Sequence, residues 1–191
     1  MNHGMKGIEM KRLAKPFSVL LAIVASLAIA LPAMAQPAAS KLKTFGTGVV
    51  TITGVDSATI VNDSGEFGGV FLQSKSNSSK LLSQVVFQFT SRADATGGAP
   101  RFSLPIDTDG TGKTVEGHAF LDALGCGGIS GGTTLVSTQN PACHVNFQSV
   151  DYANWDAFAA INPSYRSAQG ATPFIIADQA GSYTVTDIVL R

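Results

Sequence analysis

The sequence predicts an all-β antiparallel sandwich with one short helix. Residues 36–191 divide into short runs rich in β-branched and aromatic residues, separated by Gly, Asp, Asn and Ser. Apolar and polar residues alternate within the clearest runs, as expected when each sheet buries one face. Only one segment shows helical spacing of its apolar residues. Short strands at this spacing are typical of sandwiches and barrels, and the alternation favours a sandwich.

The alternation is clearest before residue 107. Val85, Phe87 and Phe89 share one face of their run, and Pro105 lacks the N–H of a ladder donor, which predicts an edge strand or a bulge. The ten runs expected to form strands are Val49–Thr53, Ala58–Val61, Gly69–Gln73, Leu81–Thr90, Arg101–Ile106, Val115–Leu121, Thr133–Ser137, Val145–Val150, Phe174–Ala177 and Tyr183–Leu190.

A single short helix is expected after residue 154. Asn154 is a good N-cap residue, and Trp155 and Phe158 follow at the spacing of one helix face. The Asn162-Pro163 pair ends the pattern. A helix of about two turns is marginal alone, so we expect Trp155 and Phe158 to hold it against the sandwich.

The first 35 residues have the three parts of a secretory signal peptide. Basic residues at 11, 12 and 15 precede an uncharged run over 17–31, and a small-residue exit follows at 33–35. The alternative is a retained membrane anchor, but the run is shorter than the roughly 20 residues of a span. We expect a signal peptide over 1–35, a flexible leader over 36–44 and one domain over 45–191. No membrane span is expected after cleavage, and the protein is expected outside the cell, at its surface or in the periplasm.

Composition excludes two classes of protein. The chain has 13 Lys and Arg, 13 Asp and Glu, and 45% apolar residues. An acidic disordered tail would need high net charge and few apolar residues. A nucleic-acid-binding surface would need clustered basic residues, so no nucleic-acid partner is expected.

The two cysteines, Cys126 and Cys143, are expected to form a disulfide. Both lie in the part of the chain expected to be exported, and in an oxidising compartment an even number of cysteines indicates disulfide bonds. The alternative is a zinc site with His144 and His118. Structural zinc sites usually show closely spaced cysteine pairs, and this sequence has none.

The loop after the fifth run carries a candidate calcium site. Asp107, Asp109 and Thr111 stand at the first, third and fifth places of an oxygen-ligand loop. The twelfth place holds His118 instead of a bidentate Glu, which excludes an EF-hand. The alternative is a hairpin loop whose Asp and Gly residues form the turn, and we favour that alternative.

Two groups of side chains are candidates for ligand binding. The two-residue period places Glu116, His118, Phe120 and Asp122 on one face, where they form either a ligand surface or an ordinary solvated face. A second group of aromatic residues, Tyr152, Trp155 and Tyr165, surrounds the helix. We expect Trp155 to fill the core and the two tyrosines to offer surface platforms for sugar rings.

The end of the chain resembles a known class of domain. Phe174–Asp178 and Gly181–Leu190 look like the closing strands of jelly-roll carbohydrate-binding modules of the galactose-binding-like type. The resemblance covers about the last twenty residues. It implies a jelly-roll topology and a polysaccharide or cell-surface glycan as partner, and modules of this type commonly hold a structural calcium.

These observations together predict a non-catalytic, extracellular binding module. A structural protein of the cell envelope or matrix is the first alternative, because edge strands can mediate assembly. A small secreted hydrolase centred on His118 or His144 is the second. No nucleophile and base stand at a recognisable catalytic spacing, so we expect no enzymatic activity.

Overall fold

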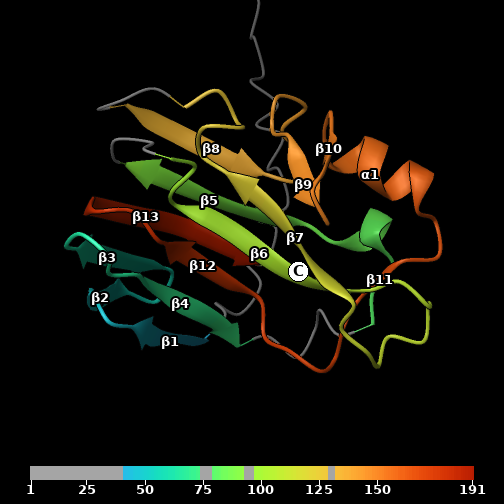
Figure 1. Ribbon diagram of the computed structural model, residues 1–191, viewed down its shortest axis with the longest axis horizontal. Helices are drawn as coiled ribbons and strands as arrows, with labels where there is room; N and C mark the ends of the chain where they lie inside the picture. The colour runs from blue at the N-terminus through green and yellow to red at the C-terminus, as the bar shows by residue number, and fades with distance from the viewer. Residues whose placement is uncertain (1–40, 74–78, 93–96, 129–131) are drawn as a thin grey trace, which may run out of the picture. The chain divides into compact units, whose positions relative to one another are not determined.

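The computed structural model describes residues 41–73, 79–92, 97–128 and 132–191. They form two antiparallel sheets with one α-helix (Figure 1). Sheet A has the order β1 (Lys41–Gly46), β4 (Gly68–Gln73), β12 (Phe174–Ala177), β6 (Arg101–Asp107), β7 (Gly117–Asp122), β9 (Val145–Phe147) and β10 (Val150–Tyr152), with β11 (Arg166–Ser167) also paired to β6. Sheet B has the order β2 (Val49–Gly54), β3 (Ser57–Asn62), β13 (Gly181–Leu190), β5 (Phe87–Arg92) and β8 (Thr133–Ser137).

The strand order is that of a jelly roll. Strands β3, β13, β5 and β8 are neighbours in sheet B, and strands β4, β12, β6 and β7 are neighbours in sheet A. The chain therefore passes between the sheets from β3 to β4, from β5 to β6, from β7 to β8 and from β12 to β13. This is the double Greek key of an eight-stranded jelly roll, with β1, β2, β9 and β10 added at the edges. The expected all-β sandwich of jelly-roll type is confirmed.

The core lies between the sheets and follows the alternation seen in the sequence. Val85, Phe87 and Phe89 are buried as expected, and so are Phe102 and Leu104. The rings of Phe87 and Phe102 stack across the two sheets with centroids 3.4 Å apart. Burying a side chain of this size contributes roughly 1.5–3 kcal/mol, so these layers supply much of the stability.

Two expected strands are interrupted. Residues Leu82–Gln84 of the fourth run form a 3-10 helix, η2, and the carbonyl of Leu82 accepts a hydrogen bond from the indole of Trp155 at 2.8 Å. The run Val145–Val150 is a hairpin: Phe147 pairs with Val150, and Gln148 and Ser149 both have positive φ. A two-residue turn of this kind connects antiparallel strands whose twist it matches.

Three further expectations need correction. The flexible leader expected over 36–44 is wrong for residues 41–44, since β1 begins at Lys41 and pairs with β4 along its length. The rest of that leader and the signal peptide expected over 1–35 lie outside the described residues. The run expected to begin at Val115 enters its strand only at Gly117. Pro105 lies in a strand paired on both sides. Along one side of β6, the strand β12 pairs as far as Ser103 and β11 pairs from Ile106 onward. Pro105, which lacks an N–H, lies in the gap between these two partners, so no hydrogen bond of the ladder is lost there.

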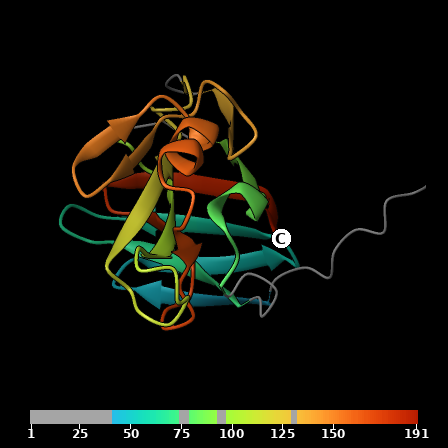
Figure 2. The same ribbon diagram turned by 90° about the vertical axis from the view of Figure 1, so that its right-hand side faces the viewer.

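The expected helix is confirmed as α1 (Trp155–Ile161). The side chain of Asn154 accepts a hydrogen bond from the backbone N–H of Ala157 at 2.9 Å, which caps the helix. Trp155 and Phe158 are buried, as expected. Figure 2 shows α1 lying beside η2, at the end of the molecule that carries the β9–β10 hairpin.

The disulfide is also confirmed. The sulfur atoms of Cys126 and Cys143 are 1.98 Å apart, and the adjoining His144 donates its backbone N–H to the carbonyl of Gly125. Both thiols are therefore used, which overturns the zinc alternative. None of the helices among the described residues combines the length and hydropathy that a membrane crossing requires.

Candidate functional site: an aromatic face on sheet A

The outer face of sheet A carries a group of rings that we call the aromatic face. The rings of Phe71 and Phe120 project outward because their strand neighbours are buried: Val70 and Leu72 beside Phe71, and Ala119 and Leu121 beside Phe120. Phe45 shares this face through the register of β1 with β4, in which Lys43 is opposite Phe71 and Phe45 is opposite Gly69. All five rings are partly exposed. The members are Phe45 from β1, Phe71 from β4, Phe174 from β12, and His118 and Phe120 from β7.

The rings form a continuous chain of contacts. Phe45 lies 4.4 Å from Phe71 and 5.6 Å from Phe174, centroid to centroid. His118 lies 5.8 Å from Phe174 and 6.3 Å from Phe120. These separations lie within the range of favourable aromatic pairs. The face therefore runs unbroken from the edge strand β1 to β7.

A glycine makes room for the first ring. Phe45 is in register with Gly69 of β4, and a Cβ added to Gly69 would lie 2.6 Å from the Phe45 ring and 2.2 Å from the carbonyl oxygen of Ile175. The ring of Phe45 thus lies over backbone that no larger residue could occupy. This close approach is what brings Phe45 against Phe71 and Phe174.

The central residues of the face are in register across the strands. Phe71 is opposite Phe174, Phe174 is opposite Ser103, and Ser103 is opposite Phe120. Phe120 is in turn opposite Asn146 of β9. Neighbouring strands are about 4.8 Å apart, so these five residues form a line of roughly 19 Å perpendicular to the strands.

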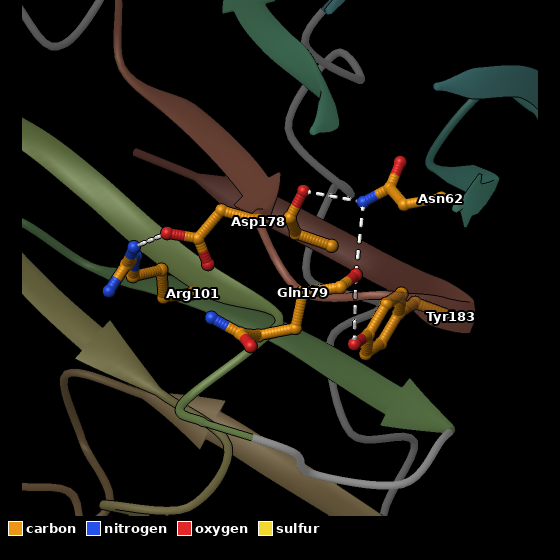
Figure 3. Close-up of polar contacts among 6 residues, drawn as sticks. Asn62, Arg101, Asp178, Gln179 and Tyr183 are labelled. Carbon is orange, nitrogen blue, oxygen red and sulfur yellow. Dashed lines mark hydrogen bonds and ion pairs between the residues drawn. The ribbon is translucent and has the colours of Figure 1, made fainter. Parts of the chain in front are cut away.

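A charged pair borders one side of this line. Arg101 and Asp178 form an ion pair, and their side chains are 30% and 28% exposed (Figure 3). The guanidinium carbon of Arg101 also lies 5.4 Å from the centroid of Phe120, a cation–π contact. The pair is electrically neutral as a unit and adjoins the last ring of the face.

Buried polar groups hold Asp178 in place. Asn62 of sheet B donates through Nδ2 to the carbonyl oxygens of Ala177 at 2.7 Å and Gln179 at 3.3 Å, on both sides of Asp178. The hydroxyl of Tyr183 bonds to the carbonyl of Gln179 as well. Figure 3 shows Asn62 and Tyr183 on one side of the turn and Arg101 on the other. The turn between β12 and β13 is therefore fixed from behind.

Three polar atoms of this region lack a partner. They are the hydroxyl of Ser103, Nε of Arg101 and Oδ1 of Asp178, each buried and without a hydrogen bond. The one other such side-chain atom among the described residues is Oδ1 of Asn62, just behind the same turn. Buried polar atoms are nearly always paired, so this concentration at one place needs an explanation.

Two of the candidates from the sequence, His118 and Phe120, lie on the aromatic face. Burial lowers the pKa of the His118 imidazole from the ordinary 6.5, which favours the neutral form at pH 7. Glu116 does not join them, contrary to the expectation from the two-residue period. It precedes β7, and its carboxylate accepts the backbone N–H of Thr108 at 2.9 Å. Asp122 shares the outer face but accepts the N–H of Gly125 at 2.5 Å.

The two tyrosines expected to be sugar platforms lie elsewhere. Tyr152 is in register with the buried Val145, so it faces the inner side of sheet A. Its ring packs on Phe158 at 4.8 Å, and Tyr165 lies 6.0 Å from Phe147. Both are half-buried against the core beside α1, and the structure does not bring them near His118.

In the candidate calcium loop, N–H and hydroxyl groups of the loop itself donate hydrogen bonds to the carboxylate of Asp107. Asp107 is fully buried, and one carboxylate oxygen accepts the N–H of Gly110 at 2.7 Å. The other accepts the N–H groups of Lys113 at 2.8 Å and Thr114 at 3.1 Å, and the hydroxyl of Thr111 at 3.1 Å. With these donors on both oxygens, the contacts favour the turn alternative. No group of three or more His, Cys, Asp or Glu suited to a metal occurs in the described part of the chain.

Sequence reasoning missed Phe45, Phe71 and Phe174. The usable signal was a ring at the outward position of a strand whose other face is already apolar, as in Gly68–Gln73 and Phe174–Ala177. No protein-family model, curated protein or solved structure matches this chain.

Proposed function

We propose that the protein is a non-catalytic, extracellular binding module whose aromatic face binds a polysaccharide or a cell-surface glycan. The observation that carries this proposal is the in-register line across sheet A, which contains three partly exposed rings, Phe71, Phe174 and Phe120, together with Ser103 and Asn146. A line perpendicular to the strands fits an extended polymer better than a compact ligand. Its length of roughly 19 Å would span about four successive sugar units, at the spacing of one unit per strand.

The chemistry of the face fits sugar rings. Aromatic side chains offer flat apolar surfaces with a negative face, and the C–H groups on one side of a sugar ring complement them. Convergent polar groups beside apolar walls then fix orientation. Here those groups are Arg101, Asp178 and Ser103, next to Phe120 and Phe174. The signal-peptide pattern and the jelly-roll topology support the same proposal.

A hydrolytic role has less support. No side-chain hydrogen bond of His118 or His144 to a carboxylate or hydroxyl is found within the described ranges, and a general base needs an orienting partner. His118 is flanked by Phe174 and Phe120 instead. Replacement of either histidine by Ala would abolish turnover if this alternative were correct.

One observation favours the structural alternative. Strand β2 is an edge of sheet B, and its Val49 and Ile52 are 66% and 43% exposed. An exposed edge with apolar side chains can pair with another chain. This role predicts oligomers or filaments in size-exclusion chromatography with light scattering, and disruption by Ile52→Lys.

The test of the proposed function is a screen of the purified protein against a polysaccharide panel by glycan array and pull-down. We expect binding to at least one neutral polysaccharide. Phe174→Ala should abolish it, whereas Leu135→Ala, which removes a 47% exposed side chain on sheet B, should not. Absence of binding across the panel, together with concentration-dependent oligomers, would favour the structural alternative.

A further inference from the structure

Ser103 occupies an unusual place in the aromatic face. It lies in β6 between Phe174 of β12 and Phe120 of β7, and it is the one small side chain between these two rings. Its neighbours Phe102 and Leu104 point into the core, so its hydroxyl projects to the outer side. The residue is nonetheless fully buried, which places its hydroxyl at the floor between the flanking side chains.

A structural role does not account for this serine. A hydroxyl donates one hydrogen bond and accepts others, and the hydroxyl of Ser103 makes none. Burying an unpaired hydroxyl is unfavourable, so alanine would suit the folded chain better at this position. The hydroxyl therefore gains its value from a partner outside the chain.

Two further unpaired atoms belong to the same place. Arg101 stands two residues before Ser103 on the same strand and face, and its Nε is an unused donor. Oδ1 of Asp178 is an unused acceptor, while its other oxygen carries the ion pair. A donor, an acceptor and a hydroxyl that does both are together the complement of neighbouring hydroxyl groups on a sugar ring.

The charges at this place disfavour an anionic ligand. The guanidinium of Arg101 is neutralised by the carboxylate of Asp178, which the turn behind it holds in place through Asn62. Lys43, the cation on this face in register with Phe71, lies three strands away from Ser103. Asp122, by comparison, stands opposite Arg101 and repels a carboxylate or sulfate group. A neutral sugar unit, by contrast, would satisfy all three atoms without separating the pair.

We propose that Ser103, Arg101 and Asp178 form a hydroxyl-recognition subsite for one neutral sugar unit, which rests between Phe174 and Phe120. The inference rests on the proposed function and adds to it the ligand class and the residue that determines specificity. Because the hydroxyl is covered, the flanking rings rotate aside when the sugar enters. Ser103 then exchanges an unpaired buried hydroxyl for a hydrogen bond to the ligand.

The test uses the polysaccharide or oligosaccharide that the purified wild-type protein binds, measured by calorimetry. Ser103→Ala should weaken binding about tenfold, the effect of losing one hydrogen bond. It should leave the melting temperature unchanged or raise it. Ser91→Ala is the matched control, because Ser91 is a buried serine on sheet B.

Monodeoxy derivatives of the bound oligosaccharide complete a double-mutant cycle. Wild type should lose affinity for one derivative about tenfold, and Ser103→Ala should bind that derivative and its parent equally. Equal affinity of Ser103→Ala and wild type for the parent sugar, with binding still lost in Phe174→Ala, would overturn the subsite and leave the proposed function standing. Absence of any sugar binding by wild type would overturn both.

Discussion

Asp107 shows how one residue can organise a loop. Its carboxylate collects backbone and hydroxyl donors from Gly110, Thr111, Lys113 and Thr114. Burial alone would raise the pKa of this carboxyl. The hydrogen bonds from Thr114, Gly110 and Thr111 outweigh burial and hold the pKa well below its ordinary value. The Asp and Gly pattern that resembles a calcium loop therefore serves the turn itself.

Replacing Asp107 should destabilise the fold. Asp107→Asn removes the charge that these donors share and should lower the free energy of unfolding by about 2–3 kcal/mol, measured by urea denaturation at pH 7. Because the folded pKa is lowered, the contribution is complete above about pH 4 and is lost as the pH falls further. Wild type should thus lose more stability than the variant between pH 5 and pH 2.

Calcium provides the matching control for this loop. The melting temperature should be the same in millimolar calcium and in chelator, because donor groups already occupy the oxygens of Asp107. A rise of several degrees in calcium that Asp109→Ala abolishes would contradict this assignment and restore the metal site.

His118, on the aromatic face, makes the stability of the fold depend on pH. Burial lowers its pKa in the folded state, so the unfolded chain takes up the proton first. The stability linked to neutral His118 is therefore complete above about pH 6.5 and declines as the pH falls below it. His118→Gln should flatten the decline in melting temperature between pH 7 and pH 5. An unchanged slope in the variant would show that His118 does not titrate in this range.

At the scale of elements, the sequence predicted strands correctly where apolar and polar residues alternate and turn-forming residues mark both ends of the run. Residues Arg101–Ile106 were placed within one residue of β6, and Asn154 marked the start of α1. The β9–β10 turn was missed because Gln148 and Ser149 adopt positive φ without the Gly or Asn that usually marks such a turn. β1 was missed because Lys41–Gly46 has only two large apolar residues and gains its place by pairing with β4.

The disulfide fastens the segment between β7 and β8 to the start of β9. Its partners are 17 residues apart, so the chain-entropy estimate predicts a loss of about 3 kcal/mol for the Cys126→Ser, Cys143→Ser double variant. Mass spectrometry of the intact protein should shift by two hydrogens on reduction. Alkylation of both thiols in the unreduced native protein would contradict the bond.

At the scale of the whole molecule, the strand topology determines which rings meet on the aromatic face, and no local sequence pattern reveals this. The aromatic face takes residues from four strands, and Phe45 and Phe174 are far apart along the chain. They meet because β4 lies between β1 and β12, an order that follows from jelly-roll winding rather than from any local pattern. The sequence revealed His118 and Phe120 because both follow the two-residue period of a single strand. The remaining rings required the register between strands.

The central claim is that the aromatic face is the ligand surface. It is tested most directly by the dissociation constants of wild type, Phe174→Ala and Leu135→Ala for the same polysaccharide. Phe174 contacts three other rings of the face, so its removal should weaken binding at least tenfold, while Leu135→Ala should match wild type. Equal affinity of wild type and Phe174→Ala, with binding lost in Tyr152→Ala, would contradict the account and move the site to the helix end of the molecule.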